Sequence, residues 1–213
     1  SVRGASQVFG LSFTPGPWIE SIQITKGAGS VVNGFESISG QINTELLKPM
    51  TDIPFFLNFY GSTDARFELN ANINHKISDK WATSLFMHGN MRDSKDDMND
   101  DGFLDNPLQK QINIFNRYQY ANAETGWVSF INFQYLNDEK LMGQVDFDPD
   151  TDRGTTNAWG SEIDTERVNI STKLGYVFPD MPYQSIGFQN AFNSHDQNSY
   201  FGLNQYNIKQ KSY

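Results

Sequence analysis

The sequence contains no cysteine, so disulfide bonds and thiolate metal sites are excluded, and thiols say nothing about the redox compartment. It has no run of about 18 apolar residues, which excludes a transmembrane helix. Basic residues are few, with 16 Lys and Arg against 25 Asp and Glu and a formal net charge of −9. Because phosphate binding requires a basic face, this balance argues against a nucleic-acid partner.

Aromatic residues, in contrast, are abundant, at 14% of a chain whose mean hydropathy is −0.55. A polar average with many aromatic side chains suits a sheet that is wet on one face and apolar on the other. A soluble β-sandwich would give the same average, so composition alone does not separate the two.

Neither end of the sequence reads as the end of a domain. The sequence does not open with a signal peptide, and the final residues lie inside a strand pattern. We therefore expect an internal part of a longer protein, with a complete small protein with frayed termini as the alternative. Two regions follow: residues 1–48 are rich in Gly and Ser, and residues 49–213 consist of long alternating segments.

The alternating segments are the main evidence for the fold. From Phe67 to Ile77 the odd positions are apolar except His75, and all even positions are polar. Other segments with this alternation have lengths close to the roughly 9–11 residues that a tilted strand needs to cross a membrane. Strands of soluble proteins average about 5–6 residues. The polar face is rich in Asn, Gln, Ser and Lys, which suits a wet lumen. The pattern predicts an all-β membrane protein, an antiparallel transmembrane β-barrel with about eight strands in this chain.

The connections support this prediction because short and long ones alternate. Short turns are expected at 77–80, 122–125 and 178–183, and long acidic loops at 92–110, 137–163 and around residue 200. Barrels of the outer membrane have short periplasmic turns and longer extracellular loops, so the long loops should face outside. Aromatic residues near the expected strand ends suit interfacial girdles, although they are also good strand formers: Trp81, Tyr118, Tyr120, Trp127, Tyr135, Tyr176 and Tyr183.

Residues 18–43 carry a motif of Ile-Glu-Ser-Ile-Gln-Ile, then Lys-Gly, a turn of small residues, Asn-Gly, and Ser-Gly-Gln-Ile-Asn. This stretch resembles the plug signature of TonB-dependent outer-membrane receptors, in which Arg-Gly and Tyr-Gly are usual at the two dipeptides. The first residues, Val-Arg-Gly, resemble an earlier plug strand. The residues that carry the resemblance are Arg3, Glu20, Lys26, Gly27, Gly29, Gly34, Gly40 and Asn43. The glycines suit tight turns and close approach of the plug backbone to a wall.

The resemblance implies that residues 1–48 are the C-terminal part of a plug domain. Residues 49–213 would then begin a barrel of about 22 strands, because eight strands leave no room for a plug. Within this family, the sequence is most similar to siderophore-receptor-like members from Bacteroidetes. It implies a Gram-negative outer-membrane protein in contact with lipid, which imports a ferric siderophore or other metal chelate, energised by TonB through a segment outside this chain. The alternative is a plugged barrel that serves as a scaffold for surface lipoproteins or a secretion machine.

An acidic loop is a candidate calcium site. From Asp97 to Asp105, oxygen-bearing side chains stand at the first, third, fifth and ninth positions, with Gly at the sixth. Leu stands where an EF-hand has its bidentate Glu, and no helices are expected beside it. We expect a structural Ca²⁺ held by Asp97, Asn99, Asp101, Asp105 and the Phe103 carbonyl, with Asp93 or Asp96 as further candidates. A solvated acidic loop is the alternative.

No enzyme motif is present, so catalytic residues are not expected. His88 and His195, near extracellular strand ends, are candidates for contact with a metal chelate. Plug charges such as Arg3, Glu20 and Lys26 are expected to pair with lumen-facing Glu68 or Arg117. A third interpretation, a soluble calcium-binding β-sandwich adhesin, predicts a chain that stays in solution without detergent.

Overall fold

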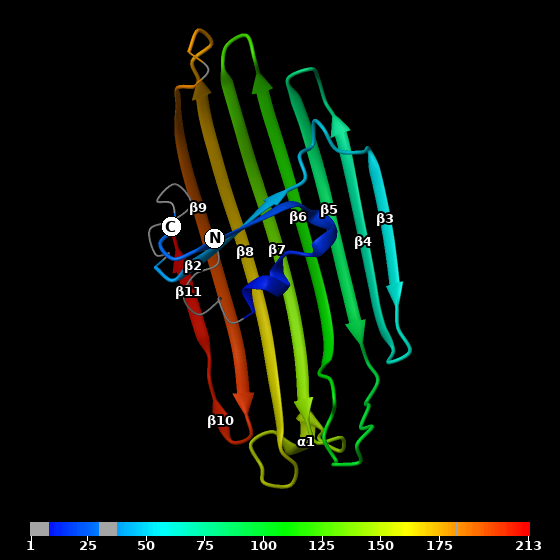
Figure 1. Cartoon of the computed structure of the whole chain (residues 1–213). Coiled ribbons are helices and arrows are strands. Elements are labelled where there is room, and N and C mark those ends of the chain that lie inside the picture. Colours follow the sequence, from blue (N-terminus) through cyan, green and yellow to red (C-terminus); the bar gives the residue numbers. More distant parts are fainter. Residues whose placement is uncertain (1–8, 30–37, 182) are drawn as a thin grey trace.

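The computed structural model describes residues 9–29, 38–181 and 183–213 (Figure 1). A small N-terminal unit contains two 3₁₀ turns, η2 (Gly10–Phe13) and η3 (Gly16–Trp18), and a hairpin of β1 (Ile19–Lys26) and β2 (Gly40–Leu46). One short helix, α1 (Pro149–Asp152), lies between two later strands. No helix in the described ranges is long and apolar enough to cross a membrane.

The rest of the described chain forms one antiparallel sheet in which β3 to β10 pair in sequence order and β11 pairs with β9. Its strands are β3 (Phe55–Gly61), β4 (Arg66–Lys76), β5 (Trp81–Arg92), β6 (Leu108–Asn122), β7 (Trp127–Gly143), β8 (Gly160–Val177), β9 (Ser185–Phe201), β10 (Asn204–Gln205) and β11 (Ile208–Ser212). β10 and β11 lie end to end along one edge of β9, so the sheet is eight strands wide. The predicted antiparallel all-β fold is confirmed at this level.

The strands are longer than predicted, and the loops are correspondingly shorter. The first long loop spans 93–107, but the second spans only 144–159, so the predicted extent of 137–163 is wrong. Backbone pairing between β7 and β8 continues past the last apolar positions, where Glu139 lies opposite Asp164. The predicted long loop around residue 200 is also wrong, because β9 and β10 are joined by a tight turn at Gly202, whose φ is 59°.

The two faces of the sheet differ in polarity, and the apolar one is open to the surroundings. On this outer face the side chains of Leu69, Ile73, Phe133 and Leu174 are 51%, 42%, 45% and 46% exposed. On the opposite, inner face, amide and hydroxyl side chains are buried, among them Asn70, Asn72, Ser84, Asn113 and Thr165. A soluble sheet protein buries its apolar face, so this arrangement is reversed.

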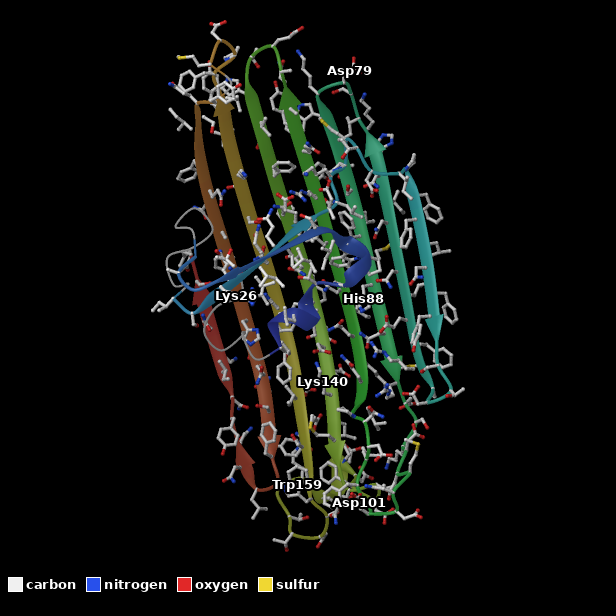
Figure 2. The ribbon with its side chains drawn as sticks, in the orientation of Figure 1. Lys26, Asp79, His88, Asp101, Lys140 and Trp159 are labelled. Atoms are coloured by element: carbon white, nitrogen blue, oxygen red, sulfur yellow. The ribbon has the colours of Figure 1, made fainter. Side chains whose placement is uncertain are left out.

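The aromatic residues predicted for strand ends mostly lie at the end of the sheet with the short turns. Trp81 and Tyr120 are cross-strand neighbours with ring centroids 4.9 Å apart, and Trp127 and Tyr176 are 5.0 Å apart. Figure 2 shows Asp79 at this end, and Asp101 and Trp159 at the opposite end with the long loops. Tyr135 lies further towards the long loops, where the apolar positions of β7 end.

The N-terminal unit crosses the inner face of the sheet (Figure 1). Trp18 is 1% exposed, and its ring centroid lies 5.7 Å from that of Phe86 on β5 and 6.1 Å from that of Phe115 on β6. Leu46 and Leu47 pack against the same cluster. This cluster is the apolar contact that fixes the N-terminal unit to an otherwise polar face.

Replacement of Trp18 by Ala should therefore loosen the N-terminal unit while the large sheet stays paired. Truncation of a buried Trp lowers the free energy of unfolding by about 3–5 kcal/mol. This is a large loss for a unit whose apolar attachment depends mainly on one cluster. Hydrogen exchange of residues 10–18 and 44–48 should rise in Trp18→Ala. Trp127→Ala, on the outer face, serves as the control and should leave this exchange unchanged; equal protection in both variants would contradict the assignment.

Candidate functional site

The candidate site is the contact between the N-terminal unit and the inner face of the sheet, which we call the plug interface. It consists of residues 9–29 and 38–53 on one side and inward side chains of β4 to β9 on the other. Its central group is the Phe13 carbonyl, which accepts hydrogen bonds from Asn113 Nδ2 at 2.9 Å and Gln134 Nε2 at 3.1 Å. Gln134 also donates to the Asn113 side chain, which fixes the two amides as a pair.

Other inward side chains bind the backbone of the N-terminal unit in the same way. Asn72 donates to the Pro17 carbonyl at 3.3 Å, and Gln119 accepts from the Met50 N–H at 3.4 Å. Arg117 donates to the carbonyls of Leu46 and Leu47 at 3.1 and 3.3 Å, and its guanidinium stacks 4.3 Å from the Phe130 ring centroid. The plug interface is therefore a set of side chain to backbone hydrogen bonds around one aromatic cluster.

Phe13 adds a second buried contact near β8 and β9. Its ring is 2% exposed and lies 5.6 Å from the Arg167 guanidinium and 6.3 Å from the His195 ring. Arg167 in turn donates to the side-chain amide oxygen of Asn193 at 2.8 Å. The Phe13 ring covers a cation that an amide holds in place, so release of the N-terminal unit would expose both the ring and the guanidinium to water.

The candidate histidines lie on this same inner face. The side chains of His88 and His195 are buried, whereas His75 is exposed on the outer face. His88 Nδ1 lies 2.7 Å from Asn70 Oδ1, and its Nε2 lies 3.1 Å from Asn90 Nδ2. An amide oxygen on one side and an amide nitrogen on the other match a neutral imidazole protonated at Nδ1. His88 is thus a member of an amide network, and no cluster of metal-ligating side chains surrounds it among the residues that the structure describes.

The residues that carry the family resemblance lie mostly on the hairpin. Gly27, with φ of 83°, makes the turn after β1, and its N–H donates to the Ser39 carbonyl at 3.1 Å. A Cβ on Gly40 would meet the Thr25 carbonyl oxygen at 3.3 Å, so the close approach is to the partner strand. Asn43 donates to Gln23 across the hairpin at 3.3 Å. Lys26 and Gly29 lie at the exposed hairpin end, and Arg3 and Gly34 lie outside the described residues.

The charge pairs expected between plug and wall take a different form. Glu20 pairs with Lys48 of its own unit at 2.9 Å, and Glu68 pairs with Arg66 of its own strand. Arg117 does reach the N-terminal unit, but through carbonyl groups.

At the end of β5 nearest the long loops, Arg92 pairs with Asp64 at 2.6 Å. The Ser62 hydroxyl, helped by the guanidinium groups of Arg92 and Arg66, lowers the pKa of Asp64. The turn between β3 and β4 therefore becomes less stable as the pH falls through that lowered pKa.

The candidate calcium loop is closed by its own hydrogen bonds. The Asp97 carboxylate accepts from the N–H groups of Asp101 and Gly102 at 3.1 and 2.8 Å, and Asp105 accepts from the Met98 N–H at 2.8 Å. Gly102, with φ of 81°, makes the predicted bend. In the described part of the chain, no group of three or more His, Cys, Asp or Glu side chains is arranged to hold a metal. Calcium binding by this loop therefore stays a prediction.

Asp148 and Asp152, in the second of the long acidic loops, make local hydrogen bonds at the start of α1. The Asp148 side chain caps α1 by accepting from the Asp150 N–H at 3.0 Å, and Asp152 accepts from the Asp148 N–H at 3.0 Å. Such bonds satisfy the free N–H groups of a helix start.

Comparisons with known protein families, with curated proteins and with solved structures found no match. The functional argument therefore rests on the plug interface and on the polarity of the two faces. The sequence predicted an inward position for Arg117, but it did not predict that Arg117, Asn113 and Gln119 bind backbone groups of the N-terminal unit. Alternation gives the side to which a residue points, whereas its partner depends on the path of a segment distant in sequence.

Arg117→Met should weaken the attachment of residues 44–50 to the inner face. A hydrogen bond from a charged donor contributes about 1.5–3 kcal/mol, and Met keeps most of the volume. Hydrogen exchange at residues 47–50 should rise well above that in Lys173→Met, whose parent residue points inward from β8 and makes no hydrogen bond or ion pair with the described N-terminal unit. Equal exchange in the two variants would remove Arg117 from the plug interface.

The calcium prediction is tested on the whole protein with a luminescent lanthanide in place of Ca²⁺. We expect sensitised emission that disappears when Ca²⁺ displaces the lanthanide. The emission should also be lost in the double variant Asp97→Asn with Asp105→Asn. Asp79→Asn, in a turn at the other end of the sheet, should keep the emission. Emission that survives the double substitution would assign the ion to another place, and absence of emission would leave a solvated acidic loop.

Proposed function

We propose that this chain is the end of the plug and the first wall strands of a TonB-dependent transporter in the outer membrane of a Gram-negative cell. In this proposal the sheet continues into a closed barrel, and the N-terminal unit fills part of its lumen. The cargo is a scarce ligand, with a ferric siderophore or another metal chelate as the expected class. TonB energises release through a plug segment that precedes the residues described.

The reversed polarity of the sheet is the observation that carries this proposal. Exposed apolar side chains cover the outer face, and buried polar side chains lie under the N-terminal unit. In water such an outer face would be a large aggregation-prone patch, because monomeric soluble proteins rarely expose contiguous apolar areas beyond a few hundred Å². Lipid removes this cost, and a polar inner face suits a water-filled lumen.

The height of the apolar band supports the same proposal. Outward side chains are mainly apolar from Trp127 to Tyr135 on β7 and from Tyr176 back to Val168 on β8. Each stretch matches the roughly 9–11 residues of a membrane-crossing strand. Beyond it, outward positions turn charged at Glu139 and Glu166, and the strands continue to the long loops. The strands therefore extend beyond the apolar band at the end that carries the long loops, which is the end predicted to be extracellular.

The chemistry of the plug interface suits a stopper that must move. Amide to carbonyl bonds contribute about 0.5–1.5 kcal/mol each, because water replaces them when they break. Among the described residues, release would expose the apolar surface of the Trp18 cluster and of the buried Phe13 ring. An interface of this kind holds the plug at rest and yields to a pull applied elsewhere on the plug.

Membrane placement predicts opposite effects for adjacent positions on β8. Ile170→Lys puts a charge on the lipid side and should cost about 2–4 kcal/mol of folding stability near the middle of the bilayer. Ser171→Lys points to the lumen and should cost less than about 1 kcal/mol. Folding titrations of the whole protein in lipid vesicles measure the difference, and equal costs would contradict the assignment of the two faces.

Transport itself is tested by uptake of radiolabelled iron chelates in cells with and without the whole protein. Uptake that requires the protein and collapses when the inner-membrane proton gradient is dissipated is expected. A protein that copurifies with surface lipoproteins or a secretion apparatus, without energy-dependent uptake, would support the scaffold alternative. A protein that stays in solution without detergent would reject both.

A further inference from the structure

The contacts between the N-terminal unit and the wall form two groups, one on each side of the β1–β2 hairpin along the chain (Figure 1). The first group consists of residues 12–18, and the second consists of residues 46–53. Carbonyls of the first group accept hydrogen bonds from the neutral amides of Gln111, Asn113, Gln134 and Asn72. A pull on the chain before residue 9 therefore loads the first group before it loads the second.

The second group is held at its start by two side chains of β6. The Arg117 guanidinium donates to the carbonyls of Leu46 and Leu47, and Gln119 accepts from the Met50 N–H. Hydrogen bonds with an ionised partner are roughly twice as strong as neutral ones. The carbonyls of the second group are thus held by a charged donor, whereas those of the first group are held by neutral amides.

The end of the second group is bound to Asn74 of β4. The Asn74 side chain donates to the Asp52 carboxylate at 2.9 Å and to the Ile53 carbonyl. Its backbone N–H donates to the Pro54 carbonyl at 2.8 Å, and β3 begins at the next residue, Phe55. The second group therefore leads directly into the paired strands of the wall.

The pairing of β1 with β2 has the geometry of a zipper under such a pull. Ile19 and Leu46 are paired at the base of the hairpin, next to the two groups of contacts. A force between these two residues loads the hydrogen bonds of the ladder one at a time, and each contributes little by itself because water replaces it. The hairpin therefore opens after the first group has detached and before the second group carries the load.

The opened hairpin is long enough to take up the whole pull. Residues 19–45 span roughly 90 Å when fully extended, since each residue adds at most about 3.3–3.6 Å. A bilayer with its head groups is only about 40–45 Å thick. A displacement of the plug by the full thickness of the membrane therefore does not have to pull on residues 46–53.

We propose that Arg117, Gln119 and Asn74 form a fixed anchor, and that transport moves residues 9–45 while residues 46–53 stay on the wall. The inference rests on the proposed function, which supplies the pull. The passage for the cargo then opens along the inner face of β6 to β9, which Phe13 covers at rest through its contacts with Asn113, Gln134, Arg167 and His195.

Photo-cross-linking of the whole protein in cells tests this division. A photo-reactive phenylalanine analogue replaces Phe13 in one variant and Met50 in another, and mass spectrometry of the linked peptides identifies the wall strand to which light joins each one. Uptake is followed with the radiolabelled iron chelate, among citrate, hydroxamate and catecholate complexes, that the unsubstituted protein imports. Light should stop uptake through the cross-linked molecules of the Phe13 variant. In the Met50 variant, uptake after illumination should equal uptake in the dark.

Two further positions complete the experiment. Phe9, whose ring lies 4.9 Å from Lys140 Nζ, also precedes the hairpin, so the analogue at Phe9 should behave like the analogue at Phe13. Phe59 is 66% exposed on the outer face of β3, so the analogue there controls for damage by light and should leave uptake unchanged.

Loss of uptake on illumination of the Met50 variant would show that residues 46–53 also leave the wall, which would overturn the anchor. Uptake that survives cross-linking at both Phe9 and Phe13 would show that the first group does not move, and it would overturn the proposal as well. An unsubstituted protein that imports none of the chelates would instead overturn the proposed function, and this inference with it.

Discussion

The fold depends on the difference in polarity between the two faces of one sheet. Within the apolar band of the long strands, outward residues are mainly apolar and exposed, and the residues between them are mainly polar and buried on the inner face, where the N-terminal unit packs. Side-chain alternation makes this difference a property of the whole sheet, because a shift by one residue would exchange the faces. The solvent on each side therefore decides whether the sheet is stable.

The N-terminal unit is attached to the polar face in a way that separates two roles. Trp18, between Phe86 and Phe115, gives position and most of the apolar burial. The amides of Asn72, Asn113 and Gln134 satisfy backbone carbonyls that would otherwise be buried without partners. Together they make an interface that is specific in geometry and that water can enter stepwise.

Alternation along the chain was sufficient to predict the antiparallel sheet, its width of about eight strands and the sides of residues such as Leu69 and Asn70. It failed at the ends of β7 and β8, because hydrogen bonding between strands continues after the apolar pattern stops at Tyr135. It also missed the Phe13 carbonyl as an acceptor, since residues about a hundred positions apart make that contact. Among the described residues, Glu68 pairs with Arg66 on its own strand, and its expected pairing with Arg3 lies outside the described residues.

The central claim is that lipid covers one face of the sheet and water the other. Because the chain has no cysteine, single cysteines can be introduced at adjacent positions and labelled cleanly. A fluorophore at 133 or 174 should be quenched by brominated lipid, and one at 132 or 173 should be quenched by a water-soluble agent instead. Equal quenching by the aqueous agent at all four positions would contradict the account.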